Sequence, residues 1–216
     1  IEKALNCSLD ISMDEIFDTY LEYGQKLKPY IQDTSVELYN AHKSGKSILF
    51  EGAQGISLDV DHGVYPFTTS SNTAAGHIST GTGVSFRDID RIIGVTKAYL
   101  SRVGESPLPS EIHGDEAKNL RDKGGEYGTT TGRPRRCGWL DLVAVRYSAM
   151  ICGTTSIACM LLDVLSGLDE IKLCVGYTLR DGSTSDRFIP DARRLAEATP
   201  IFETMQGWSE EIDDVT

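Results

Sequence analysis

The sequence predicts an α/β fold, in which a layered, largely parallel central sheet is flanked by helices. Short runs of apolar and branched residues, each typical of a strand, recur along the chain, and segments with helical periodicity lie between them. This alternation favours a parallel sheet, and ligands bind at the C-terminal ends of such strands. The expected strands lie at Ser47–Phe50, within Arg91–Val103, at Thr155–Leu162 and at Ile171–Tyr177.

Two capped helices are expected near the start of the sequence. Residues 12–28 carry apolar side chains at helical spacing, and Ser12 precedes them as an N-cap. Pro29 ends or kinks this helix, because proline cannot donate the next backbone hydrogen bond. Asp33 is the N-cap of a second helix, which runs through His42.

A further helix is expected at Trp139–Cys152, where apolar residues again recur at helical spacing. Arg180-Asp181-Gly182 is a turn signal after the last expected strand. The stretch from Glu51 to about Thr82 is too polar and glycine-rich for a regular element. Loops of that length in compact domains are usually functional or disordered.

Composition excludes several classes of protein. The chain has 216 residues, 40% of them hydrophobic, and a net charge of −11, which argues against binding nucleic acid because phosphate contacts need a basic surface. No apolar run approaches the roughly 18 residues of a membrane span. The sequence begins at Ile1 without a signal peptide, and its two ends suggest a piece of a longer protein.

The five cysteines show no spacing typical of a disulfide framework or a zinc site. Free thiols in a reducing compartment are the simpler interpretation, so the cytoplasm is the expected location. The cysteines are Cys7, Cys137, Cys152, Cys159 and Cys174.

Ser44-Gly45-Lys46-Ser47 resembles the end of a phosphate-binding P-loop. That motif needs a glycine at position 40, which is Asn40, and it needs a strand before it and a helix after it. The order of the expected elements is the reverse. A helix-ending turn at Gly45 is the better interpretation.

The first candidate functional segment is EGAQG, Glu51–Gly55. Glycines allow close approach of the backbone to a ligand, and Gln54 offers both a donor and an acceptor, although a purely structural turn has the same pattern. Asp59, Asp61 and His62 follow, and they could serve a metal, acid–base chemistry or structure alone. The hydroxyls at Thr68–Ser71 fit phosphate or ribose contacts, or a helix start at Asn72.

The second candidate segment is Gly128–Arg136, GTTTGRPRR. Three hydroxyls, a flexible glycine and three guanidinium groups in nine residues are typical of a mobile loop that grips an anion. Arginine pairs in a bidentate manner with carboxylate or phosphate. A solvated basic loop is the alternative.

Four long segments of the sequence resemble adenylosuccinate synthetases in order and spacing, between roughly Ser47 and Trp208. They are EGAQGISLDVDHGVYPFTTSSNT, KAYLSRVGESPLPSE, TTTGRPRRCGWLD and LLDVLSGLDEIKLCVGY. The resemblance implies part of a P-loop-NTPase-like fold. It also implies a ligase of purine nucleotide biosynthesis that joins L-aspartate to inosine monophosphate (IMP), using GTP and Mg²⁺, to give adenylosuccinate, GDP and phosphate.

The resemblance also implies roles for individual residues. Gln54 would contact the purine edge and the phosphorylated intermediate as a catalytic residue, and Thr69 would hold the 5′-phosphate of IMP. Arg133 would link the ribose and aspartate sites, and Arg135 would meet the aspartate carboxylates near GTP. The residues expected to close over aspartate are Val103, Thr129, Thr130, Thr131, Gly132, Arg133 and Arg135.

For the guanine base, the resemblance implies a contact from Asp163. The family has a lysine two residues before this aspartate, and here that position is Leu161, so the binding of GTP is expected to change. The family's N-terminal catalytic loop and its far C-terminal guanine loop have no counterpart in these residues. The Mg²⁺ ligands are therefore expected outside this chain, and the chain alone is expected to be inactive.

The resemblance further implies a homodimer of the full-length protein, with IMP, L-aspartate and GTP as its ligands. Residues 1–46 would form a helical segment, and residues 47–216 would form the substrate-binding α/β portion of a larger catalytic domain. Two alternatives to a piece of an enzyme stay open. One is a non-catalytic module that binds nucleotides or dicarboxylates, and the other is a dimerisation fragment.

Overall fold

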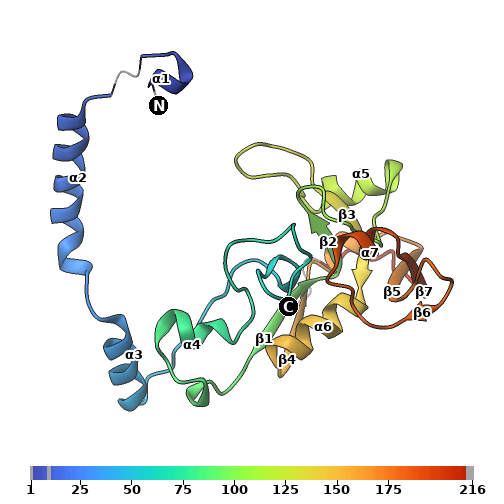
Figure 1. Ribbon diagram of the computed structural model, residues 1–216. Coiled ribbons are helices and arrows are strands. Elements are labelled where there is room, and N and C mark those ends of the chain that lie inside the picture. Colours follow the sequence, from blue (N-terminus) through green and yellow to red (C-terminus); the bar gives the residue numbers. More distant parts are fainter. Residues whose placement is uncertain (1, 9–10, 213–216) are drawn as a thin grey trace. The chain divides into compact units, whose positions relative to one another are not determined.

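The computed structural model describes residues 2–8 and 11–212, and it divides the chain into two compact units (Figure 1). The described residues up to Ile48 form the first unit, drawn in blue, and those from Leu49 onward form the second. The assignment of residues 47–216 to a substrate-binding portion of a catalytic domain stays a prediction.

The first unit is helical. Ser12 accepts a hydrogen bond from the backbone N–H of Glu15 at 3.3 Å, and Asp33 accepts from those of Ser35 and Val36 at 3.1 and 3.3 Å. Both predicted N-caps are therefore confirmed. The elements are α1 (Glu2–Leu5), α2 (Met13–Leu27), the 3₁₀ helix η1 (Lys28–Tyr30) and α3 (Thr34–Lys43).

The sequence after α3 forms a turn, as predicted. The Ser44 N–H donates to the carbonyl of Asn40 at 2.9 Å, and Gly45 has a φ of 75°, a value that glycine adopts without strain. The segment is the end of a helix, with no strand before it and no helix directly after it among the described residues, as a P-loop would require.

The second unit alternates helices and strands, which confirms the α/β class. Its helices are η2 (Ile56–Leu58), α4 (His77–Thr82), η3 (Phe86–Asp88), α5 (Gly114–Lys123), α6 (Leu142–Cys152), η4 (Asp163–Leu165) and α7 (Ala192–Ala196). Its strands are β1 (Ile93–Lys97), β2 (Tyr99–Arg102), β3 (Arg136–Asp141), β4 (Ser156–Met160), β5 (Glu170–Thr178), β6 (Thr184–Ser185) and β7 (Thr199–Gln206).

The strands form a two-stranded parallel sheet and a five-stranded sheet of mixed direction, in contrast to the single, largely parallel sheet expected. β1 pairs with β4 in parallel, and β3 pairs with β5 in parallel. The pairs β2·β3, β5·β6 and β5·β7 are antiparallel. The predicted turn at Arg180–Gly182 explains part of this result, because a tight turn joins β5 to β6 as a hairpin, which is necessarily antiparallel.

Four expected elements differ in the structure. Ser47–Phe50 is not a strand, because a strand needs a partner and no described segment pairs with it. The first residues of Trp139–Cys152 belong to β3, and the helix starts only at Leu142. A helix start at Asn72, one of the two alternatives for the hydroxyls of Thr68–Ser71, is not present, and the helix there begins at His77. The strand expected at Thr155–Leu162 is shorter in the structure, where β4 spans Ser156–Met160 and its residues are mostly exposed.

Asp141 explains why the chain changes there from strand to helix. Its Oδ1 accepts from the N–H groups of Val143 and Ala144 at 2.9 and 3.0 Å, so it is the N-cap of α6. Its Oδ2 accepts from the Tyr177 hydroxyl at 2.6 Å. Burial raises the pKa of this carboxyl despite these donors. One side chain therefore joins β3, α6 and β5.

Two apolar clusters form the core of the second unit around these elements. The first packs α5 against β2, β3 and η4, and it contains Tyr99, Ile112, Leu120, Trp139 and Leu165 among others. The second lies where α6, β5 and α7 meet, and it contains Val64, Val143, Cys174, Tyr177 and Leu195 among others.

Replacing Asp141 with alanine is expected to lower the free energy of unfolding by roughly 2 to 4 kcal/mol. The change removes an N-cap and leaves the buried Tyr177 hydroxyl without its acceptor. Urea unfolding followed by circular dichroism measures this loss. Asp191→Ala is the matched control, because Asp191 caps α7 at the surface through a single bond from Arg194. Equal losses in both variants would contradict the role given to Asp141.

Candidate functional site

The polar segment between Glu51 and Thr82 is organised by one buried carboxylate, that of Asp59. Its side chain is 0% exposed. One oxygen accepts from the N–H groups of Asp61 and His62 at 2.9 and 3.0 Å, and the other accepts from those of Thr73 and Ala74 at 2.5 and 3.1 Å. The two ends of an irregular segment are thus fixed to a single side chain.

Burial raises the pKa of Asp59, but the four backbone donors outweigh burial and hold its pKa well below the usual range. Asp59 is therefore a structural anchor that is charged at neutral pH. Of the roles open for Asp59, Asp61 and His62, which were a metal site, acid–base chemistry and structure alone, the structural role fits this arrangement. Within residues 2–8 and 11–212, no three His, Cys, Asp or Glu side chains gather as a metal site would require.

The folded segment brings Gln54 and Thr69 together, although 15 positions separate them in the sequence. The Gln54 side-chain amide donates to the Thr69 hydroxyl at 3.3 Å. Gln54 has a φ of 66°, in the left-handed region that few non-glycine residues adopt. The Thr69 N–H donates to the carbonyl of Leu58 at 2.7 Å. Both predicted residues therefore stand at one polar surface.

Arg102 joins the end of β2 to the same segment. Its guanidinium donates to the Ser57 hydroxyl at 3.1 Å and to the carbonyl of Phe67 at 3.2 Å. Val103, the next residue, is 61% exposed. Arg102 lies in a stretch with an ordinary strand pattern. No feature of the sequence therefore indicated that Arg102 connects the end of β2, next to Val103, to the segment that contains Thr69.

The predicted anion-gripping loop is a closed turn with an exposed tip. The Gly128 N–H donates to the carbonyl of Arg133, and the Gly132 N–H donates to the carbonyl of Gly128, both at 2.8 Å. Gly132 has a φ of 63°, which explains the need for glycine there. The side chains of Thr129, Thr130, Thr131 and Arg133 are exposed.

The three arginines of this loop differ in their contacts. Arg136 binds Glu111 and also donates to the carbonyls of Gly104 and Ser106 at 3.0 and 2.7 Å. Arg135 binds Glu126 at 2.7 Å. Arg133 has no side-chain partner within the described part of the chain. The sequence grouped the three arginines in one anion-gripping loop, whereas the structure pairs Arg135 and Arg136 with carboxylates and leaves only Arg133 without such a pair among the described residues.

Glu126 is the second buried carboxylate of the site, at 1% exposed. It accepts from the Tyr99 hydroxyl and from Arg135, each at 2.7 Å, and from Lys97 at close range. Burial raises its pKa, but Lys97, Tyr99 and Arg135 outweigh burial and lower the pKa to about 2. Glu126 was missed because it lies in a glycine-rich stretch that reads as a simple loop.

Leu161 and Asp163 follow β4 at its C-terminal end. Leu161 has a φ of 60°, in the left-handed region. Asp163 is the first residue of η4, and its side chain is half-buried. Its carboxylate has no hydrogen-bond partner among the residues described. A carboxylate at this position can accept hydrogen bonds from a ligand, because both of its oxygens are uncommitted.

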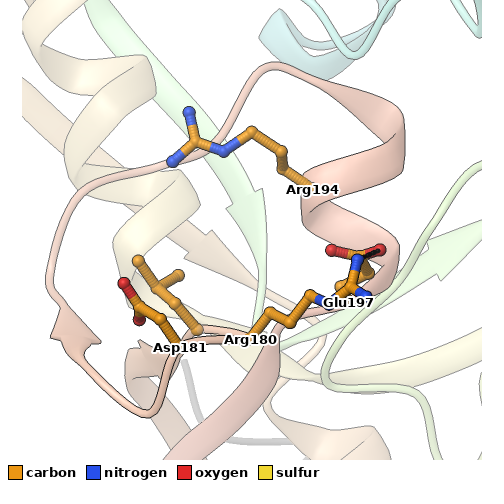
Figure 2. A pocket seen from close by; sticks show the side chains of 5 residues that line it. Arg180, Asp181, Arg194 and Glu197 are labelled. Atoms are coloured by element: carbon orange, nitrogen blue, oxygen red, sulfur yellow. Dashed lines mark hydrogen bonds and ion pairs between the residues drawn. The ribbon is translucent and has the colours of Figure 1, made fainter.

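A hollow of the second unit is lined by other residues than these. It measures about 410 Å³ and is lined by Leu179, Arg180, Asp181, Arg194 and Glu197. Figure 2 shows Arg180 directed at Glu197, which it meets at 3.2 Å. Two acidic and two basic groups balance there, so the hollow does not favour an anion, and none of the predicted site residues lines it.

Comparisons with known proteins agree with one another. The family model described as adenylosuccinate synthetase matches residues 1–216. The adenylosuccinate synthetase of Caldanaerobacter subterraneus subsp. tengcongensis is 51% identical over 202 residues, which are 94% of this chain and 47% of that protein. The one of Streptococcus gordonii is 50% identical over 208 residues, 96% of this chain and 48% of that protein.

A solved structure, titled as fully ligated adenylosuccinate synthetase from Plasmodium falciparum, matches with a TM-score of 0.92 and 36% identity. The match covers 96% of this chain and 50% of that one. The chain thus spans about half the length of the curated relatives it matches. No helix in the described residues is long and apolar enough to cross a membrane.

Asp59→Asn is expected to lower the free energy of unfolding by roughly 2 to 4 kcal/mol, because an amide nitrogen would replace one of the oxygens that accept backbone donors. The segment around it should also become a site of rapid proteolysis. Limited digestion with mass spectrometry locates the cleavages. Asp61→Asn is the control, since the one donor to the Asp61 side chain in the described residues is Asn72, at the surface. If Asp59→Asn resisted digestion as well as the wild type does, the anchoring role would be contradicted.

The Glu126 carboxyl is expected to titrate with a pKa of about 2. Because this folded-state pKa lies below the ordinary value of 4.5, the stabilisation by Glu126 is complete above pH 4.5 and is lost as the pH falls through about 2. Carbon-13 NMR of the side-chain carboxyl measures the midpoint, and Lys97→Met should raise it. A wild-type signal that titrates near pH 4.5 would show that the cluster does not hold the charge.

Proposed function

This chain belongs to the adenylosuccinate synthetase family, and on that premise we propose that it carries the IMP-binding, aspartate-binding and part of the guanine-binding residues of a GTP-dependent ligase. In the proposed reaction, GTP transfers its γ-phosphoryl group to the purine 6-oxygen of IMP and leaves as GDP. The amine of L-aspartate then attacks carbon 6 and displaces phosphate. The product, adenylosuccinate, leads to AMP.

The observation that carries this proposal is the contact between Gln54 and Thr69. A side-chain amide can meet the purine edge with a donor and an acceptor, and a hydroxyl beside it can meet a phosphate. The two groups are held at one surface by the Asp59-anchored segment. We propose that Gln54 contacts the purine edge and the phosphorylated oxygen, and that Thr69 holds the 5′-phosphate.

For aspartate, we propose a site built from the hydroxyls of Thr129–Thr131 together with Arg133, Arg135 and Val103. A guanidinium pairs with a carboxylate through two parallel hydrogen bonds, and aspartate has two carboxylates to be met. Arg133 is exposed and has no side-chain partner in the described chain. It lies on a turn in which Gly132 has a positive φ. Closure of such a loop over a bound ligand excludes water and orients the amine.

For GTP, we propose that Asp163 accepts hydrogen bonds from guanine, with Arg135 near the nucleotide. The apolar Leu161 replaces the lysine expected there, so the base would pack against an aliphatic side chain without a charge. The described acidic and histidine side chains do not form a Mg²⁺ site. We propose that the Mg²⁺ implied by the family is held by residues of the full-length protein outside this chain.

Because the chain spans about half of its relatives, we propose that it binds substrates without turning them over alone. In the full-length protein, a cytoplasmic homodimer is proposed from the family. Binding is then the property to measure, and it needs no catalysis.

Calorimetric titration of the chain with IMP is the direct test. Thr69→Val keeps the side-chain shape and removes the hydroxyl, so it is expected to weaken IMP binding about tenfold. Arg133→Ala should weaken both IMP and L-aspartate, because it is proposed to link their sites. Arg193→Ala, a change in the last turn of α7 outside these segments, is the control. A sample with a cooperative thermal transition that binds no IMP would overturn the proposal.

A further inference from the structure

Glu126 connects three parts of the second unit through one carboxylate. Lys97 is the last residue of β1, Tyr99 is the first of β2, and Arg135 directly precedes β3. All three donate to Glu126, which is 1% exposed. The charges of this cluster do not cancel, because one carboxylate faces two cations. A net positive charge is left beside the exposed loop, which favours an anionic ligand.

Arg135 is fixed at several atoms. Its N–H donates to the Glu126 carbonyl at 2.9 Å, and its own carbonyl accepts from Arg121 at 2.7 Å. Its Nη1 donates to a Glu126 oxygen at 2.7 Å, while Nε and Nη2 have no recorded contact within the described residues. The side chain is 29% exposed. Arg135 can therefore hold Glu126 with one nitrogen and offer the others to a ligand.

Arg133 differs in each of these respects, since it is exposed and without a recorded partner. An arginine side chain loses rotamer entropy when a ligand orders it. Arg135 has lost much of that freedom before any ligand arrives. The two arginines, two residues apart in the chain, thus differ in their side-chain freedom. Arg135 is held by Glu126, whereas the exposed Arg133 side chain is free to move.

We propose that Glu126 is a positioning residue, which holds the Arg135 guanidinium in place for a substrate carboxylate and ties it through Lys97 and Tyr99 to β1 and β2. The inference rests on the proposed function and names a residue outside it. Glu126 does not touch the ligand; it acts through Arg135. Its charge, rather than its size alone, is what the position requires.

The test compares Glu126→Gln with the wild-type chain by calorimetry, first with IMP and then with L-aspartate in the presence of IMP. Glu126→Gln is expected to weaken L-aspartate about tenfold and to change the IMP dissociation constant less than twofold. Glu126→Asp keeps the charge and should give an intermediate affinity. Glu197→Gln breaks an exposed pair with Arg180 and should leave both affinities unchanged.

A second measurement needs no ligand. NMR of the guanidinium nitrogens reports how freely each side chain moves, and Arg133 serves as the internal reference for an uncommitted guanidinium. Arg135 is expected to be ordered in the wild type and as mobile as Arg133 in Glu126→Gln. An Arg135 signal that stays ordered in this variant would overturn the inference, whatever the state of the binding assay.

The outcomes separate the two proposals. A wild-type chain that binds neither IMP nor L-aspartate would overturn the proposed function. It would also overturn L-aspartate as the ligand for which Glu126 positions Arg135. A wild-type chain that binds both, with Glu126→Gln equal to it in L-aspartate affinity, overturns the inference alone. An equal loss of IMP and L-aspartate affinity would show a general structural role and would also overturn it.

Discussion

A carboxylate removed from water must find hydrogen-bond donors, and this constraint organises the second unit. Asp59, Glu126 and Asp141 are each at most 3% exposed, and each accepts from donors on separate segments. Asp59 fixes an irregular loop through backbone N–H groups. Asp141 sets the change from strand to helix. Glu126 is met by charged side chains, so it is the member of the three that shapes an electrostatic surface.

The candidate site combines rigid and mobile parts, and it does so in an acidic chain with a net charge of −11. Anionic substrates would meet an unfavourable average field, so local positive charge has to be concentrated and held. Arg102 attaches Val103 to the Thr69 segment, and Arg136 ties the carbonyls that follow Val103 to Glu111. Arginines thus connect the loops of the site, and Arg133 is left to respond to a ligand.

Local signals in the sequence predicted the local features well. Ser12 and Asp33 cap helices as expected, because capping depends on residues three positions away at most. The mixed sheet and the extent of β3 could not be predicted in this way, because pairing partners lie far along the chain. For the candidate site, the motifs and their resemblance singled out Gln54 and Thr69, which the structure brings into contact, but periodicity holds no information on which carboxylate meets Arg135. Such ion pairs are fixed only by the tertiary fold.

The parallel pair of β1 and β4 has a consequence for handling the isolated chain. Parallel sheets are normally covered on both faces, yet Val95 is 74% exposed and Ile157 is 48% exposed. Unpaired backbone groups along these strands, within the described chain, can template the addition of extended segments from other molecules. Concentrated samples should therefore self-associate through intermolecular β-structure. Keeping the isolated chain monomeric will depend on solution conditions that suppress pairing at these strand edges.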